Sequence, residues 1–365
     1  MSGRGQILSH TGLRGAAALL VVMYHLGFGA PYLLPPERAI DIFRRSYLFV
    51  DFFFLLSGFV LAYVYLGDRR VAFSAAEART FLIARIARVY PLHLLTLLVL
   101  LVFHGALVGM AALGMIGAPQ SMPGDAAQFG AHLLLAQSWG FFRDVGWNIP
   151  SWSISTEFAA YLAFPLIVIA LVRARRIALV SMLALSVGFY LHVGATTGNL
   201  DLTVGVALAR GFAGFFIGVA IYLGRNLTRP LPARTLSAIQ LSAVAIMLAL
   251  FETTTNDALL IAPFAALVAA TWEDRGVVAR ALSHPVMTRL GDWSYAVYLL
   301  HVPIIHIVGF LFWRTLGRPE ALPDPLARIL WIALIYAFTI IAARIVYERF
   351  EMPARKAIVK RLAKR

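Results

Sequence analysis

The chain has 365 residues, of which 60% are hydrophobic and only 14% are charged, whereas a soluble domain carries about 25% charged residues. This composition excludes an ordinary soluble protein, and the absence of cysteine excludes disulfides, thiolate metal sites and a cysteine acyl relay. The net charge of +14 does not point to nucleic acid, because the basic residues fall in short runs between apolar segments instead of on one folded face.

Apolar segments near 20 residues long, the length that crosses a bilayer core of about 30 Å, recur along the whole chain. We therefore predict an all-α polytopic membrane helix bundle with about ten transmembrane helices. In chain order the predicted spans are 15–34, 47–66, 91–114, 152–172, 177–194, 203–223, 236–251, 258–271, 293–313 and 327–347. A short amphipathic segment at 128–140 is expected to lie at the membrane interface or to re-enter the bilayer. The first apolar run lacks a small-residue cleavage pattern, which favours a retained span over a signal peptide.

Loop charge predicts the orientation of these spans. With the N-terminus inside, the inside segments hold about 23 cations and the outside segments about seven. The outside connections at 194–202 and 252–257 contain none. This bias places both termini in the cytoplasm. No internal repeat or linker is visible, so we expect a single membrane domain over residues 1–350, followed by a basic cytoplasmic tail at 351–365.

Ionisable side chains inside a bilayer are costly, so they mark functional sites by default. At about 1.5 Å per helical residue, five of them fall in one band around the middle and outer half of the membrane. These five are His25, Asp51, Glu157, Arg210 and His301. Charges of opposite sign at similar depth can offset each other's desolvation, which indicates a central polar cavity.

Three arginines lie lower, at the cytoplasmic mouth of this band. Arg85 and Arg88 are three residues apart on a helix and share a face, whereas Arg14 opens the first span. Two guanidinium groups side by side suit a phosphorylated ligand. The order of groups across the membrane therefore suits a reaction that takes a phosphorylated donor from inside and serves an acceptor from outside.

Six short motifs follow one another at these polar residues. They are Arg14 followed after ten residues by His25, VDFFFLLSGFVL (50–61), RIARVYP (85–91), PSWSISTEFAAYLAFP (150–165), ARGFAGFFIGVAIYL (209–223) and GDWSYAVYLLHVP (291–303), with ERFEMPARK near the end. In this order, over nearly the full length, the chain resembles the acyltransferase-3 family of integral membrane O-acyltransferases.

The resemblance implies a ten-span bundle that uses acyl-CoA, usually acetyl-CoA, as its cytoplasmic donor. It implies an acceptor of the kind found in cell-surface polysaccharide or lipopolysaccharide, and neither a tightly bound cofactor nor a metal is expected. The chain departs from many members in offering one carboxylate, Glu157, where they carry two acidic residues. It is also too short for the esterase-like domain that some members append, so transfer is expected to be completed within the membrane domain.

His25 is the candidate for the general base or for a transient acyl carrier, since a neutral imidazole suits both roles. The sequence leaves this choice open, and a packed structural histidine is the alternative. Glu157 is expected either to orient His25 or to receive the acceptor proton, against a structural pairing with Arg210. The residues expected to bind the donor phosphates, against a plain positive-inside role, are Arg14, Arg85 and Arg88.

The other candidates support the cavity and its charges. Arg210 is expected to form an ion pair or to stabilise an oxyanion, and Asp51 to contact substrate or to end a helix. Ser57 is expected to allow close helix packing. The residues expected to line the cavity or support it are Trp152, Tyr298 and His301.

The sequence thus predicts a multi-pass protein of the bacterial cytoplasmic (inner) membrane that transfers an acyl group, in the first place acetyl, to a hydroxyl of a cell-surface or lipid-linked glycan. An alternative acceptor is a small secondary metabolite such as a macrolide or peptide antibiotic. The alternative from another class is a transporter that uses the buried charges as an ion-coupled relay. Transporters commonly show paired halves with broken helices, and no such repeat is visible. The sequence carries no indication of oligomeric state.

Overall fold

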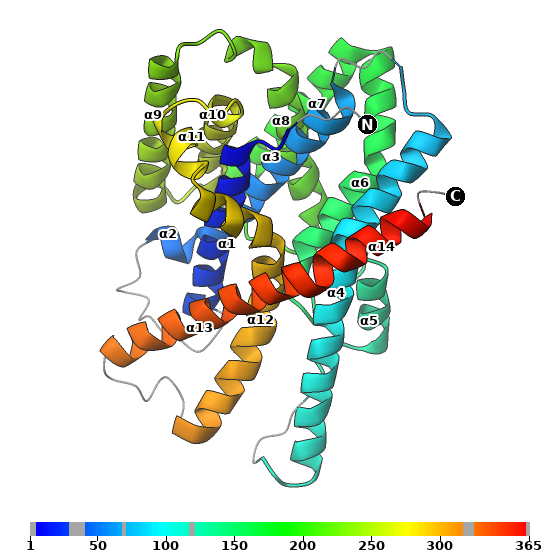
Figure 1. The fold of residues 1–365 in the computed structure, drawn as a ribbon, viewed down its shortest axis with the longest axis vertical. Helices are drawn as coiled ribbons and strands as arrows, with labels where there is room; N and C mark the ends of the chain where they lie inside the picture. Colours follow the sequence, from blue (N-terminus) through cyan, green and yellow to red (C-terminus); the bar gives the residue numbers. More distant parts are fainter. Residues whose placement is uncertain (1–4, 29–40, 68–70, 117–120, 317–324, 363–365) are drawn as a thin grey trace.

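The computed structural model describes residues 5–28, 41–67, 71–116, 121–316 and 325–362. Within these ranges the regular structure is helical throughout, with no β-strand. Figure 1 shows a helical bundle in which long helices such as α4 (Ala75–Ala112) and α12 (Pro285–Leu316) run along the long axis of the molecule. The predicted all-α polytopic helix bundle is confirmed.

Seven helical segments in the described part of the chain are long and apolar enough to cross a membrane. They are η2–α3–η3 (Ser46–Leu48, Phe49–Leu61, Ala62–Leu66), α4 (Ala75–Ala112), α6 (Ser151–Arg173), α7 (Arg175–Thr196), α9 (Ala233–Thr253), α12 (Pro285–Leu316), and the run of α13 (Pro325–Val346), η7 (Tyr347–Glu351) and α14 (Met352–Leu362). Three further helices complete the set of predicted spans: α1 (Leu8–Phe28), α8 (Ala207–Leu223) and η5–α10 (Asp257–Leu260, Ile261–Thr271). The short elements between them are α2 (Asp41–Arg44), α5 (Ala126–Leu133), η4 (Arg225–Leu227) and α11 (Val277–Leu282).

Each predicted span falls on one of these helices, except that residues 29–34 of the first span lie outside the described residues. The largest difference is α4, which begins at Ala75 and not at residue 91. Ser74 and Glu77 cap its first turn reciprocally, so the helix starts there. Pro91 is accommodated inside the helix, as prolines in membrane helices can be. Arg85 and Arg88 therefore stand on a continuous helix.

The C-terminal residues expected to form a tail are helical as far as Leu362. A π-helical turn, η7, joins α13 to α14, and α14 packs against α4. Figure 1 shows α13 and α14 as one diagonal run across the front of the bundle. Residues 352–362 thus contact the helix that carries Arg85 and Arg88.

The predicted amphipathic segment is the short helix α5 followed by an irregular stretch that reaches α6. Polar side chains of this stretch are buried and hydrogen-bonded. The Nε2 of His132 lies 2.7 Å from the Val145 carbonyl oxygen, and the Nδ2 of Asn148 donates to Thr96 of α4 and to the Leu299 carbonyl of α12, at 3.2 Å each. These bonds tie the connection to the bundle, because buried polar groups must find partners.

Glycines bring two helix pairs into backbone contact. A Cβ at Gly58 of α3 would overlap the Phe215 carbonyl oxygen of α8, and one at Gly218 of α8 would overlap the Leu55 carbonyl oxygen of α3. At the junction of α1 and α12, a Cβ at Gly291 would overlap the carbonyl oxygen of Thr11. Small residues allow such close approach between membrane helices. The two pairs carry four of the predicted residues: Asp51 and Arg210 on α3 and α8, His25 and His301 on α1 and α12.

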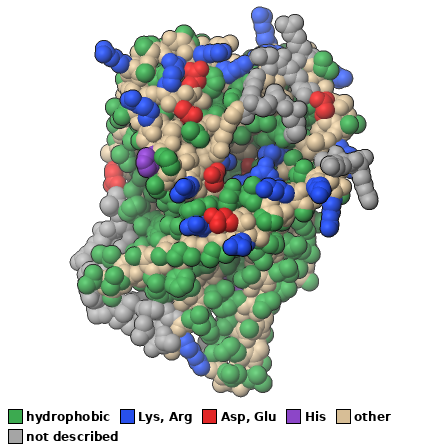
Figure 2. All heavy atoms as spheres, in the orientation of Figure 1, with side chains coloured by type: hydrophobic (Ala, Val, Ile, Leu, Met, Phe, Trp, Pro, Cys, Tyr) green, Lys and Arg blue, Asp and Glu red, His purple; other side chains and the backbone are tan. Residues whose placement is uncertain are grey.

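Charge is distributed unevenly along the long axis. Figure 2 shows Lys and Arg side chains gathered in the upper half of the molecule, while hydrophobic side chains dominate the lower half. The start of α1 and the end of α14 both lie in the upper half of Figure 1. By the positive-inside rule, this end is the one expected to face the cytoplasm.

Candidate functional site

A cavity opens among α1, α3, α4, α6 and α12, and the space free of protein atoms measures about 870 Å³ when the open solvent at its mouth is included. Six of the predicted site residues line it: Arg14, Ser57, Arg85, Arg88, Glu157 and Tyr298. Its other polar lining residues are Ser153, Tyr161, Ser294 and Tyr295, and its apolar lining includes Phe53 and Phe54 of α3. The cavity has a strongly cationic lining, and of the five residues expected to form a central polar cavity only Glu157 lines it.

Glu157 is held by two hydroxyl groups within this cavity. Ser57 Oγ donates to its Oε1 at 2.7 Å, and Tyr161, one helical turn further along α6, donates to the same oxygen at 2.6 Å. Two donors on one oxygen fix the orientation of the carboxylate. Ser57 thus does more than permit close packing, and Glu157 does not pair with Arg210.

The three predicted donor-binding arginines meet at one part of the cavity wall. The guanidinium of Arg85 lies over the rings of Tyr65 and Tyr161, at 5.6 and 5.8 Å from their centroids. Arg88 forms an ion pair with Glu351 of η7 and lies 5.2 Å from the ring centroid of Tyr295. Aromatic faces stabilise a cation without neutralising it, so Arg85 keeps its charge available toward the cavity, whereas the charge of Arg88 is balanced by Glu351.

His25 and His301 form a pair of rings between α1 and α12. Their ring centroids are 4.7 Å apart, edge to face. The Nδ1 of His25 lies 3.0 Å from the Val21 carbonyl oxygen, and the Nδ1 of His301 lies 3.2 Å from that of Val297. A carbonyl oxygen only accepts, so Nδ1 carries the proton in each neutral ring and Nε2 keeps its lone pair. In His25 the lone pair is therefore on Nε2.

The expectation that His25 shares one cavity with Glu157 is not what the structure shows, because His25 is absent from the described residues that line it. Tyr298 lies between the cavity that contains Glu157 and the pair of histidine rings. It lines the cavity, its hydroxyl lies 2.8 Å from Ser153 Oγ, and its ring lies 6.0 Å from His301 and 5.8 Å from Phe53. Starting from the three arginines and moving away from them, the groups therefore follow in the order Glu157, Tyr298, His301 and His25.

Asp51, Arg210 and Trp152 form a separate group. Arg210 of α8 binds both carboxylate oxygens of Asp51 on α3, and its guanidinium lies 4.8 Å from the ring centroid of Trp152. Asp51 and Arg210 are fully buried. Because none of the three lines the cavity, their geometry assigns them to the joint between α3, α8 and α6.

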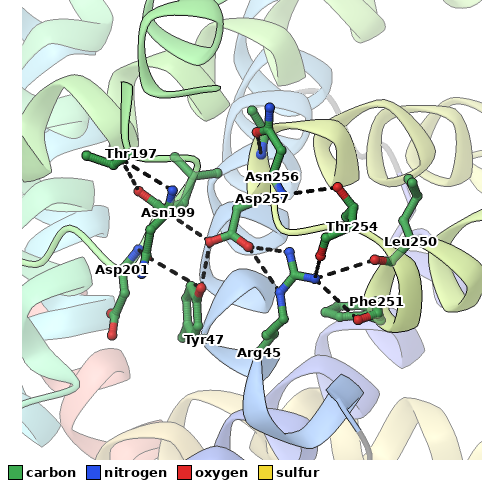
Figure 3. A network of polar contacts seen from close by, with 12 residues as sticks. Arg45, Tyr47, Thr197, Asn199, Asp201, Leu250, Phe251, Thr254, Asn256 and Asp257 are labelled. Atoms are coloured by element: carbon green, nitrogen blue, oxygen red, sulfur yellow. Dashed lines mark hydrogen bonds and ion pairs between the residues drawn. The ribbon is translucent and has the colours of Figure 1, made fainter. Parts of the chain in front are cut away.

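Sequence reasoning missed a polar network centred on Asp257 (Figure 3). Arg45 pairs with Asp257 and donates to the carbonyl oxygens of Leu250, Phe251 and Thr254. Tyr47 donates to the other oxygen of Asp257 at 2.5 Å. The backbone N–H of Leu200 also donates to Asp257 at 2.8 Å, so the two outside connections that lack cations are tied to each other and to η2.

The same network reaches His25. The hydroxyl of Tyr24 donates to Asp201 at 3.0 Å, and the Tyr24 ring lies 5.0 Å from His25. Asp201 is exposed, so this end of the histidine pair faces a polar, open surface. A tyrosine directly preceding the motif histidine was the signal that sequence reasoning passed over.

Glu351 was also missed as a partner of Arg88, although it stands in the quoted segment ERFEMPARK. Its signal was a carboxylate among cations close behind the last apolar span. Tyr65, which accepts a hydrogen bond from Arg85 at 3.3 Å, had no distinctive signal within an apolar span.

Comparison with known proteins identifies the family of the chain. The acyltransferase-3 family, described as "Acyltransferase domain", matches residues 8–348. "Acyltransferase MdmB" of Streptomyces mycarofaciens is 30% identical over 97% of this chain and 92% of its own length. "Protein 2 in picA locus" of Rhizobium radiobacter is 42% identical, over 24% of this chain and 39% of its own length. No solved structure matches significantly. The chain belongs to the acyltransferase-3 family and is a membrane acyltransferase.

Proposed function

We propose that the protein transfers an acyl group, acetyl in the first place, from cytoplasmic acyl-CoA to a hydroxyl group of a cell-surface or lipid-linked glycan at the bacterial inner membrane. The observation that carries this proposal is the order of groups along the bundle. An arginine-lined cavity lies toward the end expected to be cytoplasmic, and an oriented histidine lies beyond it, beside a polar surface.

The phosphate groups of a CoA donor need positively charged hydrogen-bond donors, which the cavity supplies in Arg14, Arg85 and Arg88. Guanidinium groups bind phosphate oxygens through paired N–H donors, and in a water-poor cavity each contact is stronger than in solution. The uncharged pantetheine arm then extends along the apolar and hydroxyl-bearing wall formed by Phe53 and Ser153. In this proposal Tyr298 and Phe53 move apart to admit the thioester to His25.

At His25 the reaction balances in either of two ways. In direct transfer, Nε2 accepts the proton of the acceptor hydroxyl, the hydroxyl oxygen forms the new C–O bond, and the C–S bond breaks. The CoA thiolate then takes the proton from the imidazolium. In the alternative, Nε2 attacks the thioester first, the C–S bond breaks, and CoA leaves as the thiolate from an acyl-imidazolium. The acceptor oxygen then forms the C–O bond, the C–N bond breaks to restore the neutral imidazole, and the thiolate takes the proton of the hydroxyl.

The acceptor approaches from the side of Tyr24 and Asp201. A carboxylate, hydroxyls and an aromatic ring suit a polyhydroxylated ligand, because each sugar hydroxyl both donates and accepts. A small hydroxylated secondary metabolite offers the same groups, so this surface alone favours neither acceptor class.

The test measures release of free CoA from acetyl-CoA by purified protein in detergent, with and without candidate acceptors. Because the chain has no cysteine, a thiol reagent reports CoA without background from the protein. His25→Ala is expected to lower turnover by at least about 10²-fold, the range of a lost general base. His192→Ala, which removes an exposed histidine of α7, is the matched control and should leave turnover unchanged.

Undiminished turnover in His25→Ala, with an unchanged melting temperature, would remove the catalytic assignment. Mass spectrometry of surface glycans from cells with and without the gene identifies the acceptor. A mass difference of one acyl group on a glycan supports the proposal, and the same difference found only on a small metabolite contradicts the glycan assignment.

A further inference from the structure

The segment joining α13 to α14 brings additional charge to the cationic part of the cavity. Glu351, the last residue of η7, is 1% exposed and forms the ion pair with Arg88. Its second oxygen, Oε2, is buried and has no hydrogen-bond partner in the described structure. A buried carboxylate oxygen without a partner is uncommon and calls for a physical explanation.

Arg355 follows Glu351 by four residues, so both side chains project toward the same face of this helical segment. Arg355 is half-buried on α14, which packs against the α4 helix of Arg85 and Arg88, and the charges of these two arginines and of Glu351 act on it. Within the described residues no carboxylate lies at ion-pair distance from Arg355. Helix α14 therefore adds an unpaired cation to two that are already present.

Three guanidinium groups around a single carboxylate repel one another, and burial strengthens that repulsion. Arg85 also keeps a buried Nε–H without a partner in the described part of the chain. Unmade hydrogen bonds of buried groups cost about 1–3 kcal/mol each. An anion with several acceptor oxygens would satisfy such donors and offset the repulsion, and a phosphate group has this chemistry.

Two π-helical turns flank this cluster. Tyr65, the hydrogen-bond partner of Arg85, lies in η3, and Glu351 ends η7. Such turns are rare and occur frequently at functional sites. In this protein the two π-helical turns place Tyr65 and Glu351 in contact with the arginines of α4.

We propose that Arg355 joins Arg85 and Arg88 in binding the phosphate groups at the nucleotide end of the acyl-CoA donor. This inference rests on the proposed function. It assigns α14 to the binding site, beyond the membrane domain expected from the sequence, and makes the donor span α4 and α14. The phosphate of an anionic lipid headgroup has the same chemistry, so the test separates these two sources.

Binding is measured by titration calorimetry with three probes that differ in phosphate: CoA, dephospho-CoA and pantetheine. The protein is held in nanodiscs of purely zwitterionic lipid. Arg355→Ala should weaken CoA binding by about 10-fold or more, as expected for a lost charge-assisted hydrogen bond. Pantetheine binding should not change, and Arg355→Lys should recover part of the CoA affinity. Lys356→Ala removes the neighbouring exposed cation and should behave as wild type.

Three results would overturn the inference. The first is an unchanged CoA affinity in Arg355→Ala, and the second is a loss of pantetheine affinity as large as the loss of CoA affinity. The third is an effect of Arg355→Ala that is seen only in nanodiscs containing anionic lipid, which would assign Arg355 to a lipid headgroup. The proposed function is judged separately. If wild-type protein binds no CoA at all, the donor assignment itself fails, whereas wild-type binding that Arg355→Ala does not weaken removes only the role of α14.

Discussion

Arg210 donates its Nε to both carboxylate oxygens of Asp51, at 3.1 and 3.2 Å, and its Nη2 to Oδ2 at 2.6 Å. Both side chains are fully buried. The pair crosses from α8 to α3 about two helical turns away from Gly58 and Gly218, where the two backbones touch. An ion pair and close packing therefore fix the same helix joint, and each can be tested separately.

Removing one partner of the Asp51–Arg210 pair should destabilise the protein strongly. Asp51→Asn or Arg210→Met leaves an uncompensated buried group, at a cost of about 3–5 kcal/mol. The double variant should lose less than the sum of the two, because no charge then remains unpaired. The free energy of unfolding in a denaturing detergent titration measures this, with Arg176→Met at an exposed position of α7 as control. Additive losses would mean that the two side chains act independently.

Gly58→Ala should separate α3 from α8. The added Cβ would overlap the Phe215 carbonyl oxygen, and neither backbone can yield without moving a helix. Overpacking of this kind costs about 1–3 kcal/mol. Gly109→Ala in α4 is the matched control, because nothing lies within 4 Å of its added Cβ. That control should be neutral or slightly stabilising, since alanine favours helix over glycine. Equal melting temperatures for the two variants would contradict the close packing.

The helices could be predicted from the sequence because a bilayer penalises charge so heavily. Each exception to the apolar pattern, such as His25 or Arg210, is therefore informative, and one helix rise per residue converts its position into a depth. Depth carries no information about the direction in which a side chain points around its helix. This is why the sequence left open whether Arg210 pairs with Glu157, and why it placed His25 in the same cavity as Glu157.

The role of the C-terminal segment could not be predicted for a related reason. The pattern of charges after the last span is typical of a solvated tail. The contact between Glu351 and Arg88 depends on the path of the chain through the π-helical turn η7 and on the packing of α14 against α4. Both are tertiary features that a local run of basic residues does not encode.

Stability should depend on pH through His132 in the connection before α6. Burial lowers the pKa of this imidazole from 6.5 to about 4. Since the folded state favours the neutral ring, its contribution is fully present above pH 6.5 and is lost as the pH falls toward 4. The loss can reach about 3 kcal/mol, at 1.36 kcal/mol per pKa unit. His132→Gln should flatten the fall in melting temperature between pH 6.5 and 4.5. If the melting temperature of this variant falls as steeply as that of wild type, other titrating groups cause the pH dependence.

Glu157→Gln should lower turnover while leaving the fold intact. The amide oxygen can still accept from Ser57 and Tyr161, so the shape and the hydrogen bonds of the site are kept and only the negative charge is lost. We expect at least about a 10-fold fall in kcat if the carboxylate receives a proton or stabilises a charged histidine. Ser57→Ala removes one hydrogen bond and should cost less. Turnover of Glu157→Gln equal to wild type would leave the carboxylate a structural role.

Arg85→Ala should raise the KM for the acyl donor far more than the KM for the acceptor. Arg85 lines the cavity and forms no ion pair within the described residues, so its loss removes charge from the donor site without stranding a buried carboxylate. Arg88→Ala would in addition leave Glu351 unpaired, and its effect on the fold would mix with its effect on binding. One guanidinium–phosphate contact is worth about 1.5–3 kcal/mol, or about a 10- to 100-fold rise in donor KM.

Arg79→Ala, at an exposed position on the same helix, is the control and should leave both KM values unchanged. A donor KM unaltered in Arg85→Ala would place the phosphate site elsewhere, and equal rises in both KM values would indicate a general distortion of the cavity.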